Sequence, residues 1–373
     1  LYLRGDAAHD AGDFDGALSW YEETVRSAAS QSSAGQARMR AAQLHLLRGD
    51  SARALAEYEA YLAAFSEGRR WEEAAWWSAR LSLSLGDTLF ARTRLERIRR
   101  DAPFSYYAVL GAQLEGRSWA LEGTEAPSDP APEWLVSEMV EIDLLSEAGL
   151  QVAADAEIAA LHTRARGEGA GALIQLAEQL VARRRTLEAI RVAQEARESG
   201  APLTVRLARV LYPFPYREIV EREAAEWGLD PLLLAGLIRQ KSAFVHDIRS
   251  SAGAIGLMQV MPATGRELAR SAGFRDFTPE SLESPDVNIH LGARFLHDML
   301  ERFDFDLPLA LSAYNAGPSR ARRWARLPEA ADPHRFTERI PFQETRGYVK
   351  NVTRNLHLYQ HLWAPDSPSN RGS

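Results

Sequence analysis

Four short blocks in the second half of the chain combine polar, aromatic and glycine residues in patterns that a helical core does not require. The blocks span residues 238–244, 250–264, 313–317 and 340–349, and read IRQKSAF, SSAGAIGLMQVMPAT, AYNAG and IPFQETRGYV. They contain a lysine, a glutamate, two tyrosines and several amides. Such residues transfer protons or form hydrogen bonds to a polar ligand. The blocks therefore predict a functional site in this half of the chain.

Taken together, the blocks resemble the soluble lytic murein transglycosylases, whose catalytic domain is similar to goose-type lysozyme. The resemblance extends from residue 211 to about residue 363. It implies cleavage of the β-1,4 bond between N-acetylmuramic acid and N-acetylglucosamine in peptidoglycan, ending in a 1,6-anhydro ring without water. In this family one carboxylic acid protonates the leaving oxygen and then accepts the proton of the sugar's 6-hydroxyl. The acetamido group of the substrate replaces the second carboxylate of the usual glycosidases.

The chain departs from the family pattern at this acid. The family pattern is Arg-Gln-Glu-Ser, and here Lys241 stands in place of the glutamate. A lysine ammonium, with a reference pKa of about 10.4, is a weak acid at neutral pH. It also puts positive charge beside a transition state that resembles an oxocarbenium ion. Because acid–base catalysis typically contributes about 10²- to 10⁴-fold, we expect this chain to be inactive or nearly so.

Three explanations of Lys241 remain open. Only two residues are lysine, Lys241 and Lys350, against 42 arginines, so background usage rarely puts a lysine at a given position. The first explanation is an engineered or chance substitution in an active enzyme, which the otherwise intact site favours. The second is a natural protein that binds the cell wall without cleaving it. In the third, another acid has taken over, and Glu344 is the candidate.

The resemblance also implies residues that line a groove for the glycan strand. These substrate-binding candidates are Ser250, Gln259, Met261, Tyr314, Asn315, Glu344 and Tyr348. Each has an alternative interpretation from the residues alone. Met258 and Met261 are equally well explained as core residues, a tyrosine at a helix end is often structural, and an isolated glutamate on such a helix usually faces solvent. Gly253, Gly256 and Gly317 are better explained as backbone turns than as contacts.

Other classes of site and partner are disfavoured. The absence of cysteine excludes thiol nucleophiles and Cys-ligated zinc. His357 and His361 have the spacing of metal ligands on one helix face, but no third ligand accompanies them, so we expect neither a metal nor a cofactor. The net charge of −7 argues against a nucleic-acid partner. No segment reaches the roughly 18 apolar residues of a membrane span.

The first half of the chain contains a repeat. Gly-Asp pairs at residues 12, 49 and 86 are 37 residues apart, and each glycine is followed five residues later by Ala17, Ala54 or Ala91. This pattern predicts helix pairs stacked as a solenoid, similar to tetratricopeptide repeats. Trp71, Trp76 and Trp77 could stack on sugars, but within a repeat such residues usually pack.

The sequence predicts an all-α protein in two domains: a solenoid over residues 1–210 and a lysozyme-like helical domain over residues 211–363, followed by a disordered tail over 364–373. The boundary is marked by Tyr212–Tyr216, whose prolines are incompatible with a helix. The seven excess negative charges all belong to residues 1–210, which carry 24 arginines and 31 acidic residues. This acidity is typical of a solvated surface; the alternative is a docking face for a protein partner.

Helix signals are clear in both domains. We expect one helical stretch from about Gly171 to Glu198 and, in the second domain, helices beginning after Asp230, Asp286 and Asp306, with a last helix over about 343–362. The chain starts at Leu1 with neither methionine nor an apolar signal core, so we expect a mature or trimmed fragment. The implied substrate, peptidoglycan, places the protein in the periplasm or otherwise outside the cytoplasm.

Overall fold

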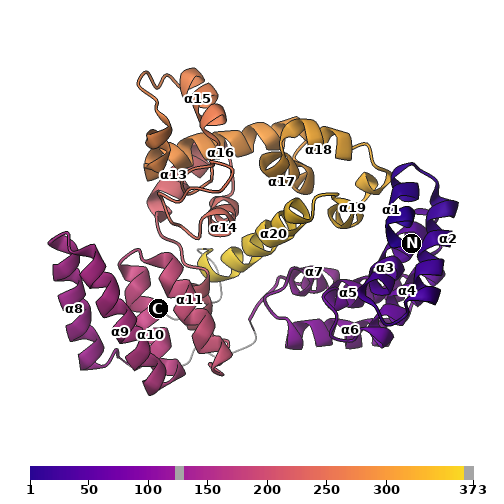
Figure 1. Ribbon diagram of the computed structural model, residues 1–373, viewed down its shortest axis with the longest axis horizontal. Helices are drawn as coiled ribbons and strands as arrows, with labels where there is room; N and C mark the ends of the chain where they lie inside the picture. Colours follow the sequence, from indigo (N-terminus) through magenta and orange to yellow (C-terminus); the bar gives the residue numbers. More distant parts are fainter. Residues whose placement is uncertain (122–129, 365–373) are drawn as a thin grey trace. The chain divides into compact units, whose positions relative to one another are not determined.

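The computed structural model of the chain describes residues 1–121 and 130–364, and the regular elements of these residues are helices (Figure 1). The prediction of an all-α protein is therefore confirmed. The predicted disordered tail lies outside the described residues, apart from Ala364. None of the described helices is both long and apolar enough to cross a membrane.

Contacts between residues divide the chain into two compact units. The first unit combines Leu1–Trp119 with Ser319–Lys350, and the second combines Ala120–Pro318 with the chain from Asn351 onward. The predicted boundary at residue 210 falls at the end of a helix at Leu211, but the contacts group the chain differently. As a domain boundary it stays a prediction.

The N-terminal part of the first unit is a row of helices in which the predicted repeat is confirmed. At each Gly-Asp pair the glycine has a positive φ, between +75° and +88°, a conformation that favours glycine. The aspartate is then the N-cap of the next helix, and its side chain accepts an N–H of the first turn. The helices of this part are α1 (Tyr2–Asp10), α2 (Phe14–Ser27), α3 (Ser32–Leu47), α4 (Ser51–Ala64), α5 (Trp71–Ser84), α6 (Thr88–Asp101) and α7 (Tyr106–Leu114).

The repeated small and large residues form the core of this part. Ala17, Ala54 and Ala91 are fully buried. Trp76 and Trp77 are also buried, and the Trp77 ring stacks on that of Tyr58 with centroids 6.1 Å apart. For Trp76 and Trp77, the packing interpretation is therefore confirmed over sugar stacking.

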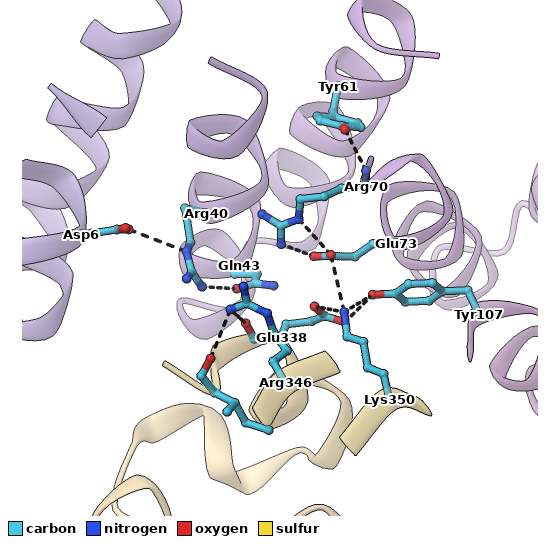
Figure 2. A network of polar contacts seen from close by, with 11 residues as sticks. Asp6, Arg40, Gln43, Tyr61, Arg70, Glu73, Tyr107, Glu338, Arg346 and Lys350 are labelled. Carbon is cyan, nitrogen blue, oxygen red and sulfur yellow. Dashed lines mark hydrogen bonds and ion pairs between the residues drawn. The ribbon is translucent and has the colours of Figure 1, made fainter. Parts of the chain in front are cut away.

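The first unit also contains helices from near the end of the chain, which share a buried polar network with α3, α5 and α7 (Figure 2). Glu73 pairs with Arg70, while Glu338 accepts from Lys350 Nζ at 2.6 Å and from the Tyr107 hydroxyl at 2.5 Å. Each buried carboxylate thus has charged or polar partners, as burial requires. These later helices are α18 (Pro318–Trp324), η2 (Pro328–Ala331), α19 (Pro333–Arg339) and the start of α20 (Gln343–Trp363).

The second unit begins with a group of helices that includes the predicted helical stretch. The stretch from about Gly171 to Glu198 is helical, and it is divided into two helices because Arg183–Arg185 form a turn in which Arg184 has a φ of +60°. Neither glycine nor proline marks this turn, so the sequence carried no ordinary signal for it. The helices of this group are α8 (Glu133–Glu147), α9 (Gln151–Glu168), α10 (Ala170–Ala182), α11 (Thr186–Glu198) and α12 (Val205–Leu211).

The remaining helices of the second unit follow their predicted signals closely. The break at Tyr212–Tyr216 separates α12 from α13, Gly228 ends α13 in the left-handed conformation, and Asp230 caps the helix that follows. One start differs by two residues, because Ser284 rather than Asp286 is the N-cap, and Asp286 lies in the first turn. The elements are α13 (Arg217–Trp227), α14 (Pro231–Lys241), α15 (Pro262–Ser271), η1 (Pro279–Glu283), α16 (Pro285–Arg302) and α17 (Leu307–Ala316).

Candidate active site around Lys241

Helix α14 determines where Lys241 lies. Asp230 accepts the N–H of Leu232 at 2.8 Å, and Pro231 occupies the first helical position. The helix then buries a continuous apolar run from Leu232 to Ile238. Its middle packs closely on α20, where the Asn355 amide donates to the Gly236 carbonyl at 2.9 Å. Lys241 is the last residue of this buried helix, so its backbone position is held firmly.

The Lys241 side chain contacts the Tyr314–Asn315 pair. Its Nζ donates to Asn315 Oδ1 at 2.6 Å and lies 5.8 Å from the centroid of the Tyr314 ring. Lys241 ends α14, and Asn315 is the penultimate residue of α17. The carbonyl ends of helices favour a positive charge and disfavour a carboxylate. The lysine is thus compatible with its position, and a glutamic acid there would be favoured in its neutral form.

The backbone after Lys241 turns sharply. Ala243 and Phe244 both have positive φ values, +48° and +64°. Ser242 supports the turn, because its hydroxyl donates to the Ile238 carbonyl at 3.2 Å and accepts the Phe244 N–H at 3.1 Å. Left-handed conformations cost energy in residues other than glycine and tend to occur at functional sites. A left-handed pair directly beside position 241 therefore supports its assignment to a site.

Tyr314 is buried in the second unit. Its hydroxyl donates to the Met258 carbonyl at 3.0 Å, and its ring lies 5.0 Å from that of Phe295. Burial raises the pKa of Tyr314 above its usual value. In this structure the phenol therefore anchors the loop around Met258, and its ring is the part that faces Lys241.

Loop 248–261 carries three of the predicted groove residues. Ser250 accepts the N–H of Ala254 at 3.0 Å, and the Gln259 amide donates to the carbonyls of Ile248 and Gly256, each at 3.0 Å. Gln259 is a further non-glycine residue with a positive φ, +52°. The side chains of Ser250 and Gln259 thus shape the loop.

The structure separates the interpretations left open for the glycines and methionines. Gly253, Gly256 and Gly317 all have positive φ, which confirms the backbone-turn interpretation. Met258 is fully buried and is a core residue, whereas Met261 is 43% exposed. Met261 is therefore not a core residue, and its side chain is accessible to a ligand.

The other two predicted groove residues come from helix α20. Glu344 is exposed in the first turn of α20, and Tyr348 is buried one turn later. Both belong to the first unit. The second unit by itself brings together Lys241, Tyr314 and Asn315, and joins loop 248–261 to them through Met258.

Asn288 is a site residue that the sequence analysis missed. It is fully buried in the first turn of α16, and its amide contacts the backbone at Ile255, Met258 and Leu282. The signal was a polar residue beside the apolar face that begins at Ile289. Periodicity alone does not separate such a residue from one at the helix surface.

The pair His357 and His361 lies in the second unit. Burial lowers the pKa of both side chains. His361 Nε2 accepts the Leu121 N–H at 3.5 Å. Among residues 1–121 and 130–364, no three histidine, aspartate or glutamate side chains form a group that could hold a metal ion.

Comparison with known proteins identifies the domain that carries this site. Residues 218–336 match the family model described as a transglycosylase SLT domain. The soluble lytic murein transglycosylase of Salmonella typhimurium is 36% identical over 155 residues, which are 40% of this chain and 24% of that protein. The protein of the same name from Escherichia coli K12 is 33% identical over 162 residues, 42% of this chain and 25% of its own length. The chain thus spans about a quarter of the length of these relatives.

Solved structures extend the similarity to most of the chain. An inactive mutant of the lytic transglycosylase Slt from Pseudomonas aeruginosa, with one glutamate replaced by glutamine, matches with a TM-score of 0.69 and 27% identity. The match covers 87% of this chain and 51% of that one. The 70-kDa soluble lytic transglycosylase of Escherichia coli matches in fold with a TM-score of 0.75, over 92% of this chain and 54% of its own. The predicted helical superhelix followed by a lysozyme-like domain is confirmed, and residues 218–336 form a domain of the transglycosylase SLT type, which is similar to that of the Slt-type proteins.

Proposed function

We propose that the chain is a lytic transglycosylase of peptidoglycan whose activity is disabled by Lys241. The observation that carries the proposal is the placement of the residue at position 241. It ends the buried helix α14, and its side chain lies beside Asn315 and the Tyr314 ring. This arrangement supports a site built around one acid–base residue.

In the proposed reaction an acid at position 241 protonates the oxygen of the β-1,4 bond between N-acetylmuramic acid and N-acetylglucosamine. The acetamido group of the muramic acid stabilises the positive charge that develops at the anomeric carbon. The carboxylate then removes the proton of the 6-hydroxyl, whose oxygen bonds to that carbon and closes the 1,6-anhydro ring. No water is consumed, and the residue returns to its starting protonation state.

Lysine is unsuited to both proton transfers. Its ammonium is a weaker acid than a neutral carboxylic acid, and it adds positive charge where the transition state is already positive. The helix ends at this position would instead favour a neutral, protonated glutamic acid, which is the form that the first step needs. We therefore assign the loss of activity to this one residue.

The proposed substrate determines the proposed location. Peptidoglycan lies outside the cytoplasmic membrane, so the protein would act in the periplasm or an equivalent extracytoplasmic space. The curated relatives are called soluble lytic murein transglycosylases, which agrees with this location. Ser250, Gln259, Met261, Tyr314 and Asn315 would line or shape the groove for the glycan strand.

The proposal is tested by digesting purified peptidoglycan with the chain and with Lys241→Glu, and by scoring 1,6-anhydro products by mass spectrometry. We expect such products from Lys241→Glu alone. Lys241→Gln is the matched control, because it removes the positive charge without supplying an acid. Products from the unchanged chain would contradict the disabling role of Lys241. Glu344→Gln in the unchanged chain would then ask whether Glu344 supplies the acid.

The second candidate is a protein that binds peptidoglycan without cleaving it, with the solenoid recruiting protein partners. It is favoured by the hydrogen bond from Lys241 Nζ to Asn315, which gives the ammonium a defined partner in the intact site. Failure of Lys241→Glu to cleave, together with sedimentation of the unchanged chain with insoluble peptidoglycan, would favour this candidate. The residue encoded at position 241 in the native gene separates an altered enzyme from a natural binder.

A further inference from the structure

Asn288 holds three backbone groups of the second unit at once. Its Oδ1 accepts the N–H of Met258 at 2.7 Å, and its Nδ2 donates to the carbonyls of Ile255 at 2.9 Å and Leu282 at 2.7 Å. The partners lie in loop 248–261 and in η1. Backbone hydrogen bonds within the loop, such as those that pair Ile255 with Val260, give it its own shape. The buried amide, with three backbone partners, fixes this loop and η1 to α16.

The loop approaches α16 so closely that side chains are excluded at two glycines. A Cβ on Gly256 would lie 2.2 Å from Asn288 Nδ2 and 2.3 Å from the Leu282 carbonyl oxygen. One turn further along α16, a Cβ on Gly292 would lie 2.5 Å from Met258 Sδ. The loop therefore packs closely against α16, and Asn288 is the polar residue of this contact surface.

Residue 258 connects this contact surface between the loop and α16 to the candidate site. Asn288 holds its N–H, while the Tyr314 hydroxyl donates to its carbonyl at 3.0 Å. The ring of Tyr314 faces Lys241 Nζ. The next residue, Gln259, has the strained φ of +52°. Residue 258 is thus fastened to α16 on one side and α17 on the other.

We propose that Asn288 is a positioning residue of the candidate site, and this role rests on the proposed function of that site. By fixing residue 258, the amide sets Tyr314 and Gln259 relative to position 241. Asn288 does not contact a substrate in this arrangement and acts through the loop. Displacement of catalytic or binding groups by about 1 Å can cost about 10²-fold in rate.

The test replaces Asn288 with aspartate, which keeps the size and the acceptor but replaces both donors with oxygen. Tyr359→Phe is the control, because Tyr359 is equally buried in the same unit and its hydroxyl donates to the Pro213 carbonyl at 2.7 Å, outside the loop. Hydrogen exchange of the Met258 and Val260 amides is measured in both variants. Release of 1,6-anhydro products per folded molecule is measured with each substitution in the Lys241→Glu chain.

We expect Asn288→Asp to speed exchange of the two loop amides at least tenfold, because a carboxylate oxygen in place of Nδ2 repels the Ile255 and Leu282 carbonyls and displaces the loop. The cleavage rate should fall about 10²-fold per folded molecule. Because only a protonated aspartic acid can donate to a carbonyl, the excess of exchange over the parent at the same pH should shrink as the pH falls. Tyr359→Phe should lower stability while leaving loop exchange and turnover near those of its parent.

Unchanged loop exchange in Asn288→Asp would overturn the positioning role, whatever the activity. An equal loss of turnover in Tyr359→Phe would also overturn it, because the effect would then be general destabilisation. If the Lys241→Glu parent cleaves nothing, the proposed function fails, and faster loop exchange in Asn288→Asp still supports the placement of the loop by Asn288.

Discussion

The two lysines of the chain lie in contrasting surroundings, one in each unit. Lys350 is part of the buried network of the first unit, where its Nζ lies 2.6 Å from Glu338 and 3.8 Å from Glu73 (Figure 2). Lys241, in the second unit, contacts a neutral amide and an aromatic ring. Lys350 therefore compensates buried negative charge that the fold depends on. The surroundings of Lys241 are those of a site that suits a neutral acid at least as well.

The contrast indicates that one residue type serves structure in the first unit and, under the proposed function, alters the chemistry of the second. A lysine with buried carboxylate partners is costly to remove, because its loss leaves charge uncompensated. Lys241 lies at the carbonyl end of a helix, where a cation contributes about 0.3–1 kcal/mol. Stability measurements should therefore respond to position 350, and activity measurements to position 241.

The largest expected effect is the gain of activity in Lys241→Glu. Restoring a general acid should raise the release of 1,6-anhydro products by at least about 10²- to 10⁴-fold. Mass spectrometry of digested peptidoglycan measures it. If Lys241→Gln raised product release by a similar factor, the comparison would fail, because the lack of an acid would then not explain the inactivity.

Substitution of Lys350 tests the structural half of the comparison. Lys350→Met should lower the free energy of unfolding by about 3–5 kcal/mol, because Glu338 loses its cation. Burial and the neighbouring Glu73 already raise the pKa of Glu338, so the loss should be smaller at pH 5, where this carboxyl protonates more readily, than at pH 8. Urea unfolding at the two pH values measures both effects, and a loss that is the same at both would contradict the charge-based explanation.

Glu73 allows a second test of the same network, through one of its carboxylates. Burial would raise its pKa, but Arg70 and Lys350 lower it to about 2, below the usual 4.5. The charged carboxylate therefore stabilises the fold above pH 4.5, and this stabilisation is lost as the pH falls toward 2. Glu73→Gln should cost about 3 kcal/mol at pH 7. Its deficit against the unchanged chain should shrink between pH 4.5 and pH 2 in urea titrations.

A smaller effect is expected from the Tyr314 hydroxyl. Tyr314→Phe leaves the Met258 carbonyl without its donor, at a cost of about 1 kcal/mol. Tyr359→Phe is the control, since this buried phenol donates to the Pro213 carbonyl at 2.7 Å, away from the loop. Both should lose similar stability, but only Tyr314→Phe should slow cleavage in the Lys241→Glu chain, by about tenfold. Equal slowing by both would remove the link between Tyr314 and the site.

The smallest effect concerns the stability of Lys241 variants. Lys241→Met should change the free energy of unfolding by less than about 1 kcal/mol, the scale of a charge at a helix end. Thermal unfolding beside Lys350→Met measures the difference. A loss as large as that of Lys350→Met would erase the contrast between the two lysines.

Features that depend on neighbouring residues were predictable from the sequence. The Gly-Asp pairs predicted the turns and N-caps of the repeat, because left-handed glycines and capping aspartates act within one helical turn. Asp230-Pro231 predicted the start of α14 for the same reason. The turn at Arg184 shows the limit, since a left-handed residue occurs there although neither glycine nor proline marks it.

The sequence by itself determined the helical class, the repeat and the four blocks that identify the site, including the lysine at position 241. Only the tertiary structure grouped Ser319–Lys350 with the N-terminal helices. It also decided that Met258 is buried while Met261 is exposed, and that the Asn288 amide bonds to the backbone of loop 248–261. The physical reason is the distance along the chain over which each feature is determined. Caps and turns are decided within a few residues, whereas burial and the partners of a buried amide depend on which distant segments pack together.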